Sequence, residues 1–262
     1  MKRWRYVLLV LCTAVISISG TYLMNYFMKS EENKQKYEDI SEIGFPETEA
    51  GHEEENDQQD VKQSEDDFDY QSLIAMNSDC VGWIQIPGTD INYPVVQAAD
   101  NEFYLTHNFN RETAACGAIF MDFRNDVDAK AEHLILYGHQ MKDNSMFKQL
   151  NGYKEEIFYK EHPNIKLYLH EQKYEYEITA VYVTDVANGG GYYNYLHWNT
   201  RKEQLNYLQQ KMAGYQIYDT GKKVMETDEL LSLSTCEYSS DNGRLIVQAR
   251  RKGEMTDGKQ II

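Results

Sequence analysis

The chain opens with a long apolar stretch that contains no charged residue. Three of the first five residues are basic, and the uncharged run then extends over the 23 residues from Tyr6 to Met28. As a helix this run would rise about 34 Å, enough to cross a bilayer core of about 30 Å. The preceding basic residues favour a cytoplasmic N-terminus. Residues 1–29 therefore predict a cytoplasmic tip and a transmembrane signal anchor, with a signal peptide cleaved near Ser17-Ile18-Ser19 as the competing reading.

The segment that follows, residues 30–68, is polar, acidic and poor in large apolar side chains. Between Ser30 and Tyr70 there are 16 acidic residues against three lysines. Such a segment buries too little apolar surface to offset the entropy lost on ordering. We expect a disordered acidic stalk here, with an acidic binding tail as the functional alternative to a plain spacer.

From residue 69 onward, short apolar runs alternate with turn signals such as Pro87-Gly88. The predicted strands are 79–86, 92–97, 117–122, 133–138, 165–170, 173–185, 229–236 and 244–247. A short helix is expected over 69–76. A longer one is expected from about Asn199 to Ala213, where apolar residues repeat at helical spacing. The pattern predicts a mainly β fold with peripheral helices, built on a closed or nearly closed barrel.

Charge and cysteine content narrow the classes of function. The net charge is −16 and no basic face is evident, which argues against a nucleic-acid partner. Neither a CxxC pair nor a His/Cys cluster with zinc-like spacing occurs, so we expect no metal and no cofactor. Cys80 and Cys116 are expected to be small buried thiols rather than a disulfide. Cys236 is then a leftover thiol, and in an exported protein such a thiol is a candidate for reactivity.

The candidate chemistry lies in a predicted hairpin near the C-terminus. Cys236 ends one apolar strand, and Arg244 begins the next after the turn signal Asp241-Asn242-Gly243. The hairpin would bring a nucleophilic thiol and a permanent cation to one end of a sheet. His139, which follows an apolar strand at Gly138, is the candidate acid and base. Taken singly, each residue also fits a structural role, and a Cys/His pair also suits a cysteine protease.

In combination these motifs resemble the sortases. The shared residues are Leu-Ser-Thr-Cys at 233–236, Gly-Arg at 243–244 and Tyr-Gly-His at 137–139, and the resemblance covers nearly all of Asp79 to Arg251. Within the family the chain is most similar to class B. That similarity rests on Asn92–Gln97, Asp100-Asn101, Tyr104-Leu105, Tyr137–Asp143, Ser145–Phe147 and the predicted helix at 199–213. Ser232 stands where the family's Thr-Leu-x-Thr-Cys run begins with threonine, and it keeps the hydroxyl.

The resemblance implies a sortase-like, closed eight-stranded β-barrel with an N-terminal helix and a helix inserted before the last two strands. Residues 69–262 would form an extracellular catalytic domain, anchored by a single membrane span at a Gram-positive cell surface. The implied activity is that of a cysteine transpeptidase. It would cleave a C-terminal sorting signal of the Asn-Pro-x-Thr type after threonine and transfer the protein to a peptidoglycan precursor amine resembling lipid II.

The resemblance also assigns roles to residues. Cys236 would form the thioester, His139 would exchange protons with the leaving and incoming amines, and Arg244 would hold the oxyanion, a task that the Glu237 backbone N–H could share. By motif position, the groove-lining residues would be Asn101, Leu105, Tyr137, Ser234 and Glu237, together with Tyr193 or its neighbour Tyr192.

Three other interpretations stay open at this point. A pilin-polymerising sortase would use the same chemistry with a lysine of another subunit as acceptor. A thiol protease would pass the acyl group only to water. A surface binding module would use an aromatic groove without catalysis, and the presence of Cys236, His139 and Arg244 together argues against it.

Overall fold

The computed structural model describes residues 2–46, 68–127, 132–185, 200, 202–203, 205–207, 212–238 and 242–253. Its helices are α1 (Lys2–Gly44), α2 (Tyr70–Met76) and α3 (Glu156–Glu161), with 3₁₀ helices η1 (Phe103–Leu105), η2 (Phe147–Lys154) and η5 (Met212–Tyr215). Its strands are β1 (Cys80–Gln85), β2 (Asn92–Val96), β3 (Ile119–Met121), β4 (His133–Tyr137), β5 (Asn164–Leu169), β6 (Gln172–Asp185), β7 (Leu230–Cys236) and β8 (Gly243–Arg251).

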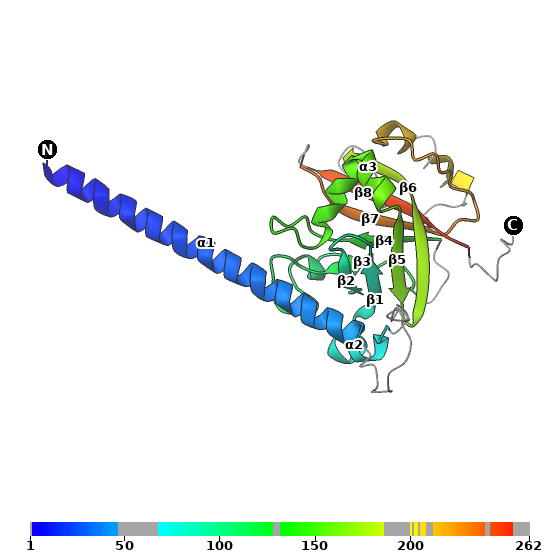
Figure 1. Cartoon of the computed structure of the whole chain (residues 1–262), viewed down its shortest axis with the longest axis horizontal. Helices are drawn as coiled ribbons and strands as arrows, with labels where there is room; N and C mark the ends of the chain where they lie inside the picture. Colours follow the sequence, from blue (N-terminus) through cyan, green and yellow to red (C-terminus); the bar gives the residue numbers. More distant parts are fainter. Residues whose placement is uncertain are drawn as a thin grey trace, which may run out of the picture. The chain divides into compact units, whose positions relative to one another are not determined.

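The strands form a closed barrel in the order β1-β2-β3-β4-β7-β8-β6-β5, and β5 pairs with β1 to complete it. Two neighbouring pairs are parallel, β2 with β3 and β4 with β7, and the others are antiparallel. Figure 1 shows β4, β7 and β8 side by side in the barrel wall. Because parallel strands point the same way, the C-terminal ends of β4 and β7 lie at one end of the barrel. The predicted barrel and its strands are confirmed.

Alternation along the strands builds two apolar layers. On β4, β7 and β8 the fully or almost fully buried inward positions are Leu134, Leu136, Leu231, Leu233, Leu245 and Val247. Each such side chain contributes roughly 1.5–3 kcal/mol on burial. The opposite face carries a second cluster of Ile135, Tyr182, Leu230 and Ile246, covered by Tyr207 and Val224 from the connection between β6 and β7. Covering both faces explains why apolar residues occur on both faces of these strands, while the strand that carries Cys236 also buries Ser232, Ser234 and Thr235.

The predicted helices are found where the described residues allow a comparison. Asp69 caps α2 by accepting a hydrogen bond from the backbone N–H of Ser72 at 2.9 Å. In the predicted insertion, residues 202–203 and 205–207 are helical, and the Thr200 hydroxyl accepts from the Glu203 N–H at 3.2 Å. Residues 212–213 of the predicted helix begin the 3₁₀ helix η5, and its remaining residues other than Thr200 lie outside the described residues. The apolar pattern does not predict η1, η2 or α3, because such short helices show no clear apolar periodicity.

The expectation of a disordered stalk from residue 30 is wrong for its first part, because α1 continues to Gly44. Ile40 is 3% exposed, and the Phe45 ring packs edge-on against Trp83 at 5.5 Å. The Asn92 amide also donates to the Ser41 hydroxyl at 3.0 Å. Residues 40–46 thus belong to the compact unit that holds the barrel. Apolar contacts with the barrel order a segment whose own composition gave no sign of order.

Candidate active site

Cys236 and Arg244 are direct cross-strand partners at one end of the β7–β8 ladder. Paired Cα atoms in an antiparallel ladder lie about 4.5–5.5 Å apart, and their side chains leave the same face of the sheet. Cys236 is half-buried and carries a free thiol. Nη1 of Arg244 donates to the Gly243 carbonyl at 2.8 Å, which ties the guanidinium to the start of its own strand. The candidate nucleophile and a permanent cation are therefore held together by strand register.

His139 reaches the same end of the barrel through the β4–β7 pairing. Beyond the paired residues, the Gly138 N–H donates to the Ser234 carbonyl at 3.2 Å, and the Thr235 hydroxyl donates to the Gly138 carbonyl at 2.8 Å. These two bonds hold the chain just before His139 against the chain just before Cys236. The three candidate catalytic residues therefore come from three adjacent strand ends.

The imidazole of His139 is oriented by a backbone group. Its Nε2 lies 2.7 Å from the carbonyl oxygen of Leu105. A carbonyl oxygen can only accept, so Nε2 carries a proton in this arrangement. The nitrogen left to take up or release a proton is Nδ1, as a general acid and base requires.

The glycine between β4 and His139 is required by close packing. A Cβ at Gly138 would lie 2.5 Å from Cδ1 of Ile119 and 2.7 Å from Cδ2 of Phe147. The Phe147 N–H in turn donates to the His139 carbonyl at 2.9 Å. The Tyr-Gly-His motif therefore combines a catalytic candidate with the only residue type that lets β3 and η2 approach its backbone.

Hydrogen bonds of Gln140 connect the loop after His139 to the backbone of Cys236. Nε2 of Gln140 donates to the Cys236 carbonyl at 3.0 Å, and Lys148 donates to Oε1 of Gln140 at 3.4 Å. Gln140 belongs to the Tyr137–Asp143 motif, but the sequence alone indicates no role for it. The structure shows that its side chain fixes the backbone of the nucleophile.

Glu237 differs from its expected role in one respect. Its backbone N–H donates to the Gly243 carbonyl at 2.9 Å, so this N–H is not available to share the oxyanion with Arg244. Its side chain is bound as well, because Nζ of Lys154 on η2 lies 2.6 Å from Oε1 of Glu237. Residue 237 is 8% exposed. The carboxylate of the residue that follows Cys236 is thus paired with Lys154.

The residues expected to line the substrate groove differ in their exposure and in their hydrogen-bond partners. Asn101 and Tyr137 both contact the Asp122 carboxylate, at 3.1 Å from Nδ2 and 2.7 Å from the hydroxyl. Leu105 is exposed and holds His139 through its carbonyl. Ser234, in contrast, is only 2% exposed and lies within the covered outer face of β7. Tyr192 and Tyr193 lie outside the described residues.

Comparison with known proteins agrees with this geometry. A family model described as the sortase domain matches residues 84–252, which include all three candidate catalytic residues. The chain belongs to the sortase family. It is 37% identical to a sortase B of Listeria monocytogenes over 180 residues, covering 68% of this chain and 72% of the relative. It is 31% identical to a sortase B of Staphylococcus aureus over 261 residues, covering 95% and 97%.

Solved structures place this sortase with class B. A sortase B of Bacillus anthracis in complex with AAEK1 has a TM-score of 0.71 at 32% identity, covering 87% of this chain and all of that one. A Staphylococcus aureus sortase B–substrate complex has a TM-score of 0.70 at 30% identity, covering 86% and 98%. The protein is therefore a class B-type sortase, a cysteine transpeptidase.

The remaining cysteines of this sortase outside the N-terminal helix are buried and free. Cys80 is 2% and Cys116 4% exposed, which agrees with the expectation of two small buried thiols. Burial raises the pKa of Cys80 to about 12, so it stays a protonated, inert thiol. Cys236, in contrast, is partly open to solvent.

Sequence reasoning missed the side chains that hold Asn101 and Tyr137, above all Asp122 and its partner Arg124. Asp122 is completely buried directly after β3, and Arg124 forms a two-point contact with it. An Asp-x-Arg sequence at a strand end was the available signal. It was not usable alone, because such pairs are common on exposed turns. Among the described residues, no group of three or more His, Cys, Asp or Glu side chains is arranged to hold a metal ion.

Proposed function

We propose that this sortase cleaves a C-terminal sorting signal of the Asn-Pro-x-Thr type after threonine, and joins the protein to a peptidoglycan precursor amine. The observation that carries the proposal is the meeting of Cys236, Arg244 and His139 at one end of the β4, β7 and β8 strands. A thiol nucleophile, a cation for the oxyanion and an oriented imidazole are the groups that acyl transfer needs.

The first half-reaction forms the acyl-enzyme. The Cys236 thiolate attacks the threonine carbonyl carbon, and Arg244 stabilises the negative oxygen of the tetrahedral intermediate. The C–N bond then breaks as His139 gives its Nδ1 proton to the leaving amine. With the Glu237 N–H engaged, Arg244 carries the oxyanion stabilisation that the described residues offer.

The second half-reaction reverses these roles. The acceptor amine attacks the thioester carbonyl, His139 takes the amine proton at Nδ1, and Cys236 leaves as thiolate. The new amide bond replaces the thioester, and the enzyme returns to its starting protonation state. A primary amine on a peptidoglycan precursor fits this step because it is a stronger nucleophile than water.

The N-terminal part supports a membrane-anchored placement. α1 contains an apolar stretch long enough to span a bilayer, and basic residues precede it. We place residues 1–29 as cytoplasmic tip and anchor, and the barrel on the outer face of a Gram-positive cell membrane. There it would meet both surface proteins bearing sorting signals and a lipid-linked amine.

The proposal is tested with the full-length chain in detergent and quenched Asn-Pro-x-Thr peptides, with and without an amine acceptor. Mass spectrometry identifies the products, and Cys236→Ala is the control. A Cys236-dependent cut after threonine, with the acceptor joined to threonine, supports the proposal. Cleavage by water alone in ample acceptor indicates a protease. Transfer only to a pilin lysine indicates a polymerising sortase. No cleavage of any sorting peptide overturns the assigned signal.

A further inference from the structure

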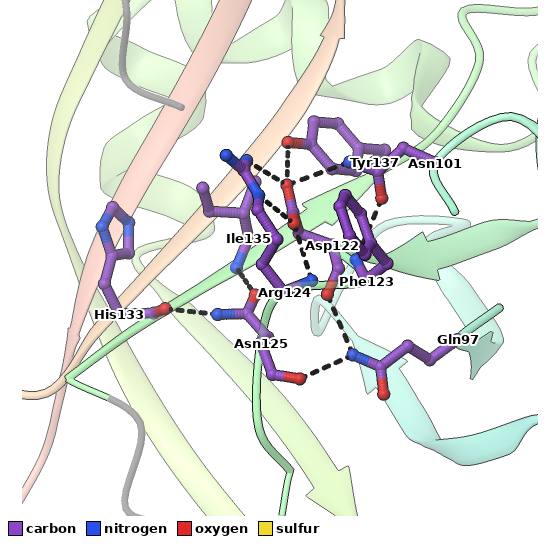
Figure 2. Close-up of polar contacts among 9 residues, drawn as sticks. All are labelled: Gln97, Asn101, Asp122, Phe123, Arg124, Asn125, His133, Ile135 and Tyr137. Atoms are coloured by element: carbon purple, nitrogen blue, oxygen red, sulfur yellow. Dashed lines mark hydrogen bonds and ion pairs between the residues drawn. The ribbon is translucent and has the colours of Figure 1, made fainter. Parts of the chain in front are cut away.

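Asp122 is a carboxylate with no exposed surface at the end of β3, beside the candidate groove. Figure 2 shows it at the centre of polar contacts that join the ends of β2, β3 and β4. Arg124, Tyr137 and Asn101 all approach its two oxygens. A buried charge is expensive unless it is paired and hydrogen-bonded, so a complete set of partners is needed here.

The carboxylate oxygens of Asp122 are saturated by protein donors. Oδ1 accepts from the backbone N–H of Arg124 at 3.0 Å and from its Nε at 2.8 Å. Oδ2 accepts from Nη2 of Arg124 at 2.7 Å, the Tyr137 hydroxyl at 2.7 Å and Nδ2 of Asn101 at 3.1 Å. A bound peptide therefore cannot reach this carboxylate and can sense it only through the residues it holds.

The charge of Asp122 persists at neutral pH. Burial raises the pKa of this carboxyl, but the hydrogen bonds from Arg124 and Tyr137 lower it by more, so the pKa lies below its ordinary value. A well-packed apolar side chain would often stabilise such a site as well as an ion pair does. The directional bonds, rather than the stability alone, are what a carboxylate adds at this position.

Those bonds leave Asn101 in one orientation. Its Nδ2 faces the acceptor Asp122, and its Oδ1 faces the donor N–H of Phe123 at 3.0 Å, so flipping the amide would break both bonds. Asn101 is half-buried and, among the described residues, keeps one N–H and one lone pair without a partner. The proton of Tyr137 is directed at Asp122, so toward a further partner this hydroxyl acts as acceptor.

The oriented side chains lie on the approach to the nucleophile. Tyr137 pairs with Ser234, and Ser234 is two residues before Cys236 on the same face of β7. Cys236 lies one strand across from Tyr137 and two residues further along. With about 3.3 Å per residue and about 4.8 Å between strands, their Cα atoms are about 8 Å apart. This separation equals two to three residues of an extended peptide. Since the proposed signal lies upstream of the scissile bond, a peptide held at Cys236 is long enough for that signal to reach the cluster.

The geometry points to Asp122 as a positioning residue for substrate recognition, which holds the Asn101 amide and the Tyr137 hydroxyl ready for the peptide segment upstream of the cleaved bond. This inference rests on the proposed function, since it needs a sorting peptide in that groove. It assigns Asp122 no contact with the peptide and no part in proton transfer.

The test measures peptide cleavage by the full-length chain carrying Asp122→Asn, Asn101→Ala, Tyr137→Phe, or Asp122→Asn with Asn101→Ala. Glu177→Gln is the matched control. Glu177 is also a little-exposed carboxylate, bound by Nε of Arg250 at 2.8 Å, but it lies at the opposite end of the β6–β8 ladder from Arg244. The readouts are kcat and KM, the rate of Cys236 alkylation and the unfolding midpoint.

We expect Asp122→Asn to raise KM about tenfold, with kcat and the alkylation rate within about threefold of wild type. The double variant should resemble Asn101→Ala, since the two residues act as a unit. Glu177→Gln should leave KM unchanged at a similar loss of stability. If Asp122→Asn does not fold because Arg124 is left unpaired, Asp122→Asn with Arg124→Gln removes both charges and should raise KM in the same way.

The possible failures can be told apart. If Asn101→Ala and Tyr137→Phe both cleave like wild type, the groove assignment within the proposed function is wrong, and the positioning role is wrong with it. If these two variants are impaired but Asp122→Asn keeps a normal KM, the positioning role alone is overturned. It is also overturned if the effects of Asp122→Asn and Asn101→Ala simply multiply, or if kcat and alkylation fall together with stability.

Discussion

Leu105 and His139 are joined by a 2.7 Å hydrogen bond between the backbone carbonyl oxygen and Nε2. This bond makes Nδ1 the nitrogen available for proton transfer. Leu105 also presents an exposed side chain where a peptide is expected to lie. The proposed substrate contact at Leu105 and the orientation of the candidate acid-base group would therefore be linked through a single residue.

Arg244 is expected to carry the oxyanion stabilisation. Arg244→Ala should keep the fold but lower the rate of peptide cleavage about 10²–10³-fold, the usual effect of losing an oxyanion donor. Arg244→Lys should restore little, because it lacks the planar fork of the guanidinium. Steady-state kinetics and circular dichroism measure both effects. Arg251→Ala, at the far end of β8, serves as the control, and wild-type rates from Arg244→Ala would contradict the assignment.

Gly138→Ala should disturb the site through packing. The new methyl group would meet Ile119 and Phe147 inside van der Waals contact, so we expect a loss of roughly 1–3 kcal/mol in the free energy of unfolding. Activity should fall further than this loss explains, since His139 follows directly. Gly214→Ala is the matched control, because apart from its chain neighbours no heavy atom of the described residues lies within 4 Å of its added Cβ. If the two variants have the same free energy of unfolding in urea and the same rate of peptide cleavage, the close packing of Ile119 and Phe147 against Gly138 is unimportant.

Lys154→Met should remove the ion pair of the Glu237 carboxylate, which belongs to the residue that follows Cys236. The pair is partly buried, so the expected loss in the free energy of unfolding is roughly 1–3 kcal/mol, between the values for surface and buried pairs. An uncompensated negative charge also disfavours a neighbouring thiolate, so iodoacetamide should alkylate Cys236 more slowly at neutral pH. Adding Glu237→Gln should recover much of both losses. If the single variant reacts at the wild-type rate, the charge of Glu237 does not influence the thiol.

Asp122 should make the stability of the barrel depend on pH in the acid range. Its pKa in the folded protein is below the ordinary 3.8, so the unfolded chain binds the proton more readily. The stabilisation is then fully present above about pH 4 and is lost as the pH falls through the lowered pKa. Asp122→Asn should lower the free energy of unfolding by up to about 3 kcal/mol at pH 7, with a smaller difference at acid pH. Urea titrations at both pH values test this, and a difference that stays constant with pH would show that Asp122 does not contribute through its charge.

Sequence reasoning succeeded where the physical signal is local. Alternating apolar positions and turn residues predicted the strands, and the hairpin between β7 and β8 predicted that Cys236 and Arg244 would meet, because a hairpin pairs residues that are close in the chain. It failed for residues 30–44, which are helical, and for the buried Ile40 and the contact of Phe45 with Trp83 that follow within the compact unit. It also assigned the Glu237 N–H to the oxyanion, although the hairpin itself uses that group.

The sequence by itself therefore determined the barrel strands, the apolar N-terminal helix, the family motifs and the pairing of nucleophile with cation. The tertiary structure alone decided that the chain at Gly138 lies against Thr235, 97 residues away, and so brings His139 to the nucleophile. It alone also decided that Asp122 is buried among Arg124, Tyr137 and Asn101. Strand propensity and turn chemistry act between near neighbours in the chain. Contacts across parallel strands, and the pairing of a buried charge, depend on how the whole barrel closes.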